Sequence, residues 1–273
     1  MSRPKVSSVY DTYIAQKGSL NRTARYEGME HWFHASAAGM CKRKIYFESV
    51  EKIQPTKKNA DTLRLFRLGD LVHGDIQRAF EIYAQRTGAR ILIEKEIRIE
   101  DLNVRGFLDL ALLDHNHLYD IKTCNSFKWK KLFGRIPDAN SDVNYQLQLG
   151  TYGMWIEQEF GELEGLSIAY YNKNTSAMRE IAFDRSIVVN AKQYWLDLNA
   201  QFELDGMPEI AFGNAPMQAW ECNPKYCSFF HACGGGLKPE LLEEKNAKTG
   251  HNSNADQNIF GAYAALDRDG KTA

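Results

Sequence analysis

The stretch VRGFLDLALLDHNHLYDIKT, residues 104–123, predicts two β-strands joined by a short polar turn at residues 114–116. Most of it is apolar, yet Asp109 lies within the first strand, and Asp120 and Lys122 lie within the second. Because side chains alternate between the two faces of a strand, Asp120 and Lys122 share a face, with Asp109 roughly opposite them. The three charged groups are therefore expected to converge on one partly covered patch.

Such a patch needs a positive charge, because two buried carboxylates repel each other and lose their hydration. Lys122 could compensate one carboxylate, whereas a Mg²⁺ or Mn²⁺ ion would compensate both and prefers carboxylate oxygens. The lysine would then be free to orient or deprotonate the attacking water in the hydrolysis of a phosphodiester. On the hairpin alone, a structural ion pair and a metal site are equally well supported.

The rest of the chain predicts an α/β fold with a mixed central sheet flanked by helices. Periodicity predicts helices over residues 35–50, 61–85, 143–160 and 186–203, and further strands over residues 89–100, 165–174 and 177–184. The helix over 61–85, with Asp61 as its expected cap, has a polar stripe of Asp70, His73, Gln77 and Glu81. We expect one domain over residues 1–240 and a disordered tail over 241–273.

Composition excludes several classes of protein. Of the 273 residues, 44% are apolar and 25% are charged, which is typical of a globular domain with a sizeable core. No apolar run approaches the roughly 18 residues that a membrane span needs, and the N-terminus lacks the apolar core of a signal peptide. We therefore expect a cytoplasmic protein. Its net charge of −1 gives no indication of a polyanionic partner.

One local stretch does suit a nucleic acid. Residues 122–137, KTCNSFKWKKLFGRIP, contain five basic residues, three aromatic residues and no acidic residue. Cations that bind phosphates and rings on which bases stack are typical of single-strand binding. The residues expected to contact DNA are Lys128, Trp129, Lys130 and Lys131. A solvated basic loop explains the stretch equally well.

Cysteines are the second candidate ligand set. Three of the five lie close together, as Cys222, Cys227 and Cys233, while Cys41 lies near the start of the expected domain. An odd number of cysteines without a secretion signal argues against a disulfide framework. Three clustered thiolates need a fourth ligand to complete a tetrahedral metal site or an iron–sulfur cluster.

The hairpin resembles the PD-(D/E)XK nuclease superfamily, in its RecB-like branch. GFLD (106–109) matches the G-x-x-D strand of that family, and YDIKT (119–123) matches the strand bearing (D/E)-x-K. Upstream, GDLVH (69–73) matches G-x-x-x-H on a helix, and downstream QLGTY (148–152) matches Q-x-x-x-Y. The four motifs occur in the order of the family, which implies a restriction-endonuclease-like core.

The resemblance implies a role for each matched residue. Asp109 and Asp120 would bind Mg²⁺ or Mn²⁺ together with His73 and the backbone carbonyl of Ile121, while Lys122 would position the attacking water. Gln148 and Tyr152, one helical turn apart, would hold either the DNA strand or the geometry of the site. Tyr152 could equally pack in the core with Trp155 and Ile156.

The cysteines resemble those of a subset of RecB-like nucleases that includes AddB-type and small CRISPR-associated enzymes. In that subset one early and three late cysteines hold a 4Fe–4S cluster that joins the ends of the domain. The resemblance implies that Cys41, Cys222, Cys227 and Cys233 are the ligands here. The spacing after Cys222 is longer than usual in the family, so His231 or Cys124 could replace Cys222, and structural Zn²⁺ is the competing occupant.

These features lead to the hypothesis of a metal-dependent DNA exonuclease that acts on single-stranded ends. The alternative is a non-catalytic nucleic-acid-binding module of a recombination or CRISPR adaptation complex, which would not need all of the catalytic residues. A site-specific endonuclease is less well supported, because the chain has no separate recognition domain. The small size and the lack of a helicase region are typical of a stand-alone nuclease of a phage or mobile element, and DNA repair or recombination would be its setting.

Overall fold

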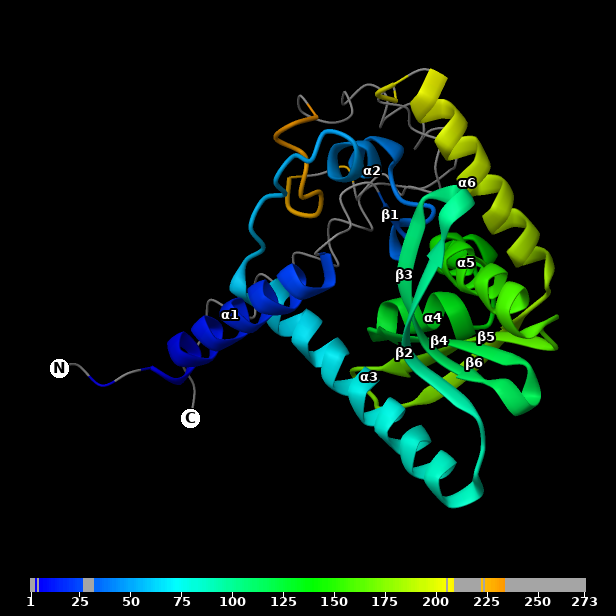
Figure 1. The fold of residues 1–273 in the computed structure, drawn as a ribbon. Helices are drawn as coiled ribbons and strands as arrows, with labels where there is room; N and C mark the ends of the chain where they lie inside the picture. Colours follow the sequence, from blue (N-terminus) through cyan, green and yellow to red (C-terminus); the bar gives the residue numbers. More distant parts are fainter. Residues whose placement is uncertain are drawn as a thin grey trace. The chain divides into compact units, whose positions relative to one another are not determined.

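The structure, a computed structural model, describes residues 3, 5–26, 32–204, 206–208, 222 and 224–233, with side chains in all of these except 18–26, 139 and 140. The chain divides into two compact units, Met1–Met217 and Gln218–Ala273. In the second unit, residues 224–226 and 228–233 form turns, and the tail expected over 241–273 lies outside the described residues. The fold that follows is that of the first unit (Figure 1).

The centre of this unit is a six-stranded sheet. The strands are β1 (Phe33–His34), β2 (Ile91–Ile99), β3 (Val104–Leu112), β4 (His117–Cys124), β5 (Gly165–Asn172) and β6 (Met178–Phe183). The pairs β1–β3 and β4–β5 are parallel, whereas β2–β3, β3–β4 and β5–β6 are antiparallel. The predicted mixed sheet is therefore confirmed.

Six α-helices accompany the sheet: α1 (Val6–Tyr26), α2 (Lys42–Ser49), α3 (Ala60–Thr87), α4 (Ser126–Phe133), α5 (Val143–Phe160) and α6 (Ser186–Leu204). Helix α3 contacts β2, β3 and β4, and α5 contacts β2, β4 and β5. Figure 1 shows the sheet lying between α3 on one side and α5 and α6 on the other. The predicted flanking helices are thus confirmed. No helix in the described part of the chain is both long and apolar enough to cross a membrane.

Strand β3 is shared among three neighbours. β2 pairs with it from Val104 to Leu112, with one interruption at Asp109. Along its other edge β1 pairs only with Val104 and Arg105, and β4 pairs only with residues 110–112. Among the described strands, residues 106–109 therefore have no neighbour on that edge, and the sheet forks there.

Two asparagines set the register of this part of the sheet. Asn103 ends the turn between β2 and β3 with φ 54°, and Asn116 ends the turn between β3 and β4 with φ 41°. Asparagine tolerates this left-handed backbone better than most residues that have a side chain. Leu110 consequently pairs with Tyr119, and the next residues along the two strands are Asp109 and Asp120.

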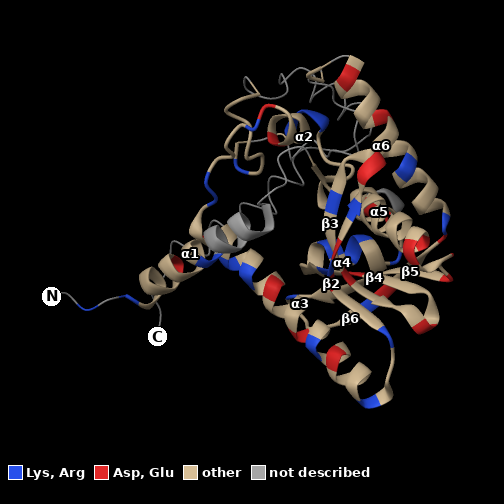
Figure 2. Cartoon of the chain, viewed as in Figure 1, with Lys and Arg blue, Asp and Glu red and all other residues tan. Residues whose placement is uncertain are grey.

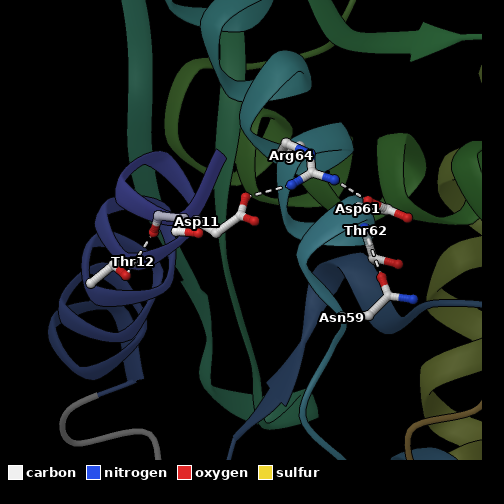
Figure 3. Close-up of polar contacts among 7 residues, drawn as sticks. Asp11, Thr12, Asn59, Asp61, Thr62 and Arg64 are labelled. Atoms are coloured by element: carbon white, nitrogen blue, oxygen red, sulfur yellow. Dashed lines mark hydrogen bonds and ion pairs between the residues drawn. The ribbon is translucent and has the colours of Figure 1, made fainter. Parts of the chain in front are cut away.

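The two ends of helix α3 are set by capping residues rather than by burial in the core. The Asn59 side chain accepts a hydrogen bond from the Thr62 backbone N–H at 2.9 Å, and Gly88 ends the helix with φ 77°. Asp61, the predicted cap, lies instead in the first turn and pairs with Arg64. Figure 3 shows that Arg64 also reaches Asp11, which ties α1 to the beginning of α3.

The apolar core lies mainly between the sheet and helices α5 and α6. Trp195 is fully buried, stacks on Phe33 with 5.8 Å between ring centres, and donates from Nε1 to Thr151 Oγ1 at 2.8 Å. Gly150 allows α6 to approach α5, because a Cβ at that position would lie 2.2 Å from the carbonyl oxygen of Ile187. This packing gives the forked edge of β3 a rigid support.

The sequence did not predict two of the helices. Residues 1–30 lack a clear apolar pattern, yet residues 6–26 form α1. The basic stretch after β4, considered as a loop, forms α4, and the Asn125 side chain caps it by accepting from the Lys128 N–H at 2.8 Å. The helix expected over 35–50 is shorter, since α2 begins at Lys42 and Cys41 is its N-cap residue.

Candidate metal centre

Asp109 lies at the fork of the sheet. Its carboxylate oxygen Oδ2 accepts a hydrogen bond from the backbone N–H of Ile121 at 2.7 Å, so a side chain occupies the place of a strand-to-strand bond. Burial raises the pKa of Asp109, and the charge of Lys122 and the bond from Ile121 only partly oppose this shift. The structure thus holds a carboxylate where water cannot stabilise its charge.

Asp120 and Lys122 form an ion pair beside it, with 2.5 Å between Asp120 Oδ2 and Lys122 Nζ. Asp120 is 0% exposed, and neither of its oxygens has a partner with hydrogen-bond geometry in the described structure. Burial raises the pKa of Asp120 to about 7, against the lowering effect of Lys122. One ammonium group therefore compensates these two carboxylates incompletely.

The ammonium group of Lys122 is itself stabilised by the two carboxylates. Burial lowers the pKa of Lys122, but the charges of Asp120 and Asp109 outweigh it, so the pKa is raised overall. The Nζ atom also lies 5.2 Å from the ring centre of Tyr145, which faces Lys128 as well, at 5.5 Å.

His73 comes from α3, one turn before Gln77, the buried residue of that helix. Its Nδ1 atom lies 3.8 Å from Asp109 Oδ1. Burial lowers the pKa of His73, the charge of Lys122 lowers it further, and the charges of Asp120 and Glu94 oppose the shift. A neutral imidazole has a free nitrogen lone pair, which is the form that binds a metal ion.

Glu94 completes a set of three potential ligands. One ligand atom from each of His73, Glu94 and Asp109 lies within 4.8 Å of the other two, which is the only such set of His, Cys, Asp and Glu in the described part of the chain. Glu94 has a left-handed backbone, with φ 46°, in the middle of β2. Strain of this kind costs about 1–3 kcal/mol and is found mainly at functional sites.

Glu94 is not among the ligands predicted from the sequence, although the sequence contains a signal for it. If β2 and β3 form a hairpin centred between residues 101 and 102, residue 94 lies opposite residue 109, and the observed pairs Ile93–Leu110 and Lys95–Leu108 follow this count. The other acid near the middle of β2, Glu96, pairs with Arg98 and Arg105.

The other expected ligands are placed differently. Asp120 is outside the set formed by His73, Glu94 and Asp109, and it faces Lys122. The backbone of Ile121 lies next to the set, since its N–H binds Asp109 and a backbone hydrogen bond with Ile121 acts on the pKa of His73. Two carboxylates and one imidazole, with a third carboxylate beside them that Lys122 compensates only in part, suit Mg²⁺ or Mn²⁺, and the imidazole favours Mn²⁺.

Gln148 and Tyr152 are both buried, on α5. Gln148 Nε2 donates to Tyr152 Oη at 3.0 Å, and the Tyr152 ring lies against Gly106 of β3, where a Cβ atom would be 3.1 Å from Tyr152 Cε1. Burial raises the pKa of Tyr152, and the charges of Asp120 and Asp109 raise it further. This position favours a role in holding the geometry of the fork rather than direct contact with DNA.

Helix α4 separates the basic stretch into two faces. Lys128 is half-buried, where it pairs with Asp142 and donates to the carbonyl of Ser141. Trp129 packs on the core with Phe133, and the Arg179 guanidinium lies over both rings. Lys130 and Lys131 are exposed, as is Phe127, which is the exposed ring of this helix.

The cysteines belong to different units. Cys41 is in the first unit, and Cys222, Cys227 and Cys233 are in the second. None of them is in a disulfide in the described structure, and the three late cysteines do not form a convergent ligand set within residues 222 and 224–233. Cys124 is buried in the first unit, and burial raises the pKa of its thiol.

No protein-family model and no curated protein sequence matches the chain. Among solved structures, SSO0001 aligns with 77% of this chain and 89% of its own, at 19% identity and a TM-score of 0.44. The alkaline exonuclease LHK-Exo of Laribacter hongkongensis, alone and in complex with dAMP, aligns with 66% of this chain and 92% of its own, at 14% identity and a TM-score of 0.43. Likeness of this extent assigns no activity to the chain.

A bound cation should stabilise the fold through these ligands. We expect Mn²⁺ at about 100 times its dissociation constant to raise the melting temperature by about 5–10 °C, because only the folded state holds the site. The variant Asp109→Asn should lose this increase, while Asp101→Asn, at an exposed turn between β2 and β3, should keep it. Thermal unfolding with and without Mn²⁺ measures the effect, and an equal increase in Asp109→Asn would exclude Asp109 as a ligand.

Proposed function

We propose that the protein is a divalent-metal-dependent deoxyribonuclease, a single-strand-preferring exonuclease that hydrolyses phosphodiester bonds. The observation that carries this proposal is the burial of two carboxylates, those of Asp120 and Asp109, around the single ammonium group of Lys122, which lies 2.5 Å from Asp120 Oδ2. Asp109 is buried beside this pair, and Glu94 lies within ligand distance of Asp109 and His73. An ion pair with Lys122 explains one acid, but it gives no reason to bury the second carboxylate, that of Asp109, beside it.

Each residue has a role in this proposal. The cation would be held by His73, Glu94 and Asp109. When it is bound, Asp120 would contribute the negative charge of its carboxylate to the site. The bound Mg²⁺ or Mn²⁺ would supply Lewis-acid stabilisation of the phosphate. Lys122 would orient the attacking water and offset the charge that develops on the phosphate oxygens.

The DNA strand would be guided by the outer face of α4. Phe127, Lys130 and Lys131 are three and four residues apart and so share one side of the helix. Phe127 is 48% exposed, and Lys131 Nζ lies 5.1 Å from its ring centre. An exposed ring beside ammonium groups suits a base and its phosphates, and α4 begins two residues after the strand of Asp120 and Lys122. Helices α1, α2, α3 and α6 carry charges of both signs, and α5 carries only acidic residues (Figure 2).

We also propose that Cys41, Cys222, Cys227 and Cys233 hold a structural 4Fe–4S cluster. Support comes from the closeness in sequence of Cys222, Cys227 and Cys233, none of which is in a disulfide, and from the position of Cys41 at the beginning of α2, where it is partly exposed. Thiolate ligands suit iron–sulfur clusters and zinc alike. The cluster would have no part in the hydrolysis.

Lys122→Ala should remove the activity. We expect wild-type protein with Mg²⁺ or Mn²⁺ to release nucleotides from the ends of labelled single strands, faster than from duplexes. Loss of the ammonium group should lower the rate about a hundredfold or more. Lys192→Ala, at an exposed position of α6, is the matched control. A wild-type protein that binds DNA without degrading it would instead support the non-catalytic binding module.

Phe127→Ala should weaken single-strand binding about tenfold, because stacking on one base contributes about 1–3 kcal/mol. Fluorescence anisotropy of a labelled oligonucleotide in EDTA measures binding without cleavage. Phe160→Ala is the matched control, since Phe160 is similarly exposed, at 44%, but lies at the end of α5 between Glu157 and Glu162 in the sequence. Equal loss in both variants would rule out the α4 surface.

Iron and sulfide content tests the cluster. Protein purified without oxygen should be brown and contain about four iron and four sulfide per chain. Cys227→Ala should lose both, whereas Cys124→Ala, which removes a buried thiol of the first unit, should retain them. Colourless protein that contains zinc and no iron would show that the cysteines hold zinc instead of the cluster.

A further inference from the structure

Gln77 is the only residue of α3 that is buried, in a helix of 28 residues. It lies one turn after His73, on the same side of the helix. A buried amide needs partners for both of its N–H groups, because an unpaired buried donor is destabilising. The hydrogen-bond partners of Gln77 therefore indicate why an amide is buried here.

Both partners of Gln77 belong to the candidate metal centre. Its Nε2 atom donates to Glu94 Oε1 at 3.0 Å and to the backbone carbonyl of Asp109 at 3.1 Å. Each bond uses one of the two amide hydrogens, so the donor end of the side chain is fully committed. One amide thus joins the carboxylate of one potential ligand to the backbone of another.

The bonds of Gln77 fall at the single interruption in the β2–β3 ladder. The pairs Ile93–Leu110 and Lys95–Leu108 flank the interruption, and Glu94 and Asp109 are not paired with each other. Glu94 has its left-handed backbone at this point. The carbonyl of Asp109 accepts a hydrogen bond from the Gln77 side chain at this point.

We propose that Gln77 is a positioning residue that holds Glu94 as a metal ligand facing His73 and Asp109. This inference rests on the proposed function, since it assigns a task within the same cation site. Without the amide, the Glu94 carboxylate would lose the bond that fixes its direction, and the backbone at 94 would lose the support that keeps it in an unfavourable conformation. Gln77 itself touches neither the cation nor the DNA.

The test is Mn²⁺ affinity, measured by isothermal titration calorimetry on the full chain. Gln77→Met keeps the length of the side chain but removes both hydrogen bonds, and we expect about tenfold weaker Mn²⁺ binding. Gln193→Met is the matched control, because Gln193 of α6 also donates to a carboxylate, that of Asp197 at 2.7 Å, outside the site. This control should bind Mn²⁺ like the wild type.

A double-mutant cycle separates positioning from a merely structural role. Glu94→Gln retains an acceptor for Gln77 but lacks the charge of a ligand, so it should bind Mn²⁺ weakly with little change in unfolding without metal. If Gln77 acts through Glu94, adding Gln77→Met to Glu94→Gln should lower the affinity little further. Additive losses would overturn the proposal. Gln77→Asn, which keeps a shorter amide, replaces Gln77→Met if that variant does not fold, and the same weakening is expected.

The outcomes distinguish this inference from the proposed function. Wild-type affinity in Gln77→Met, together with loss of binding in Asp109→Asn, would overturn the role of Gln77 and leave the metal site intact. Absence of Mn²⁺ binding by the wild type would overturn both.

Discussion

The fork in strand β3 is the constraint on which the site depends. On the edge of β3 that faces β4, residues 106–109 have no strand neighbour among the described elements, yet they lie inside the unit. Buried backbone groups must be satisfied, and at a fork side chains have to do this. The Asp109 carboxylate accepts the N–H of Ile121, and Gln77 donates to the carbonyl of Asp109. Polar side chains at this point are therefore a requirement of the topology, and a cation site can be built from them.

The same fork brings negatively charged side chains together in a buried place, where water does not stabilise their charge. Asp109 and Asp120 are adjacent in the sheet, and burial raises the pKa of both. An apolar core that includes Trp195 and Tyr170 holds the strands in place despite this repulsion. Carboxylates are buried at the fork, whereas the core around it is apolar. This distribution is expected when a scaffold supports a functional site.

The sequence predicted the strands and helices that follow strong periodic patterns, and it placed Asp109 roughly opposite Asp120 or Lys122. The pairing of Leu110 with Tyr119 decides between them, because Asp109 and Asp120 are the next residues along the two strands. The sequence did not predict α4, which has a local cap at Asn125 and an ion pair of Lys128 with Asp142, a contact between residues distant in the sequence. Glu94 was not predicted as a ligand because, in a strand of alternating polar and apolar residues, it resembles any other polar residue. Only the register between β2 and β3 shows that it lies opposite Asp109. Trp129 likewise faces the core because of the orientation of α4 about its own axis. The sequence, which shows only an aromatic residue among basic ones, does not predict that orientation.

Helix α3 links the chemistry of the site to the mechanics of the fold. Its one buried residue is the polar Gln77, while apolar residues such as Leu65 and Leu68 are exposed, so few buried apolar contacts attach the helix. Its attachment depends on Arg64 at one end and on the polar contacts of the site along its length. A cation between His73 and Glu94 would join α3 to β2 directly. Binding of the metal and docking of the helix are then one equilibrium, so whatever strengthens one must strengthen the other.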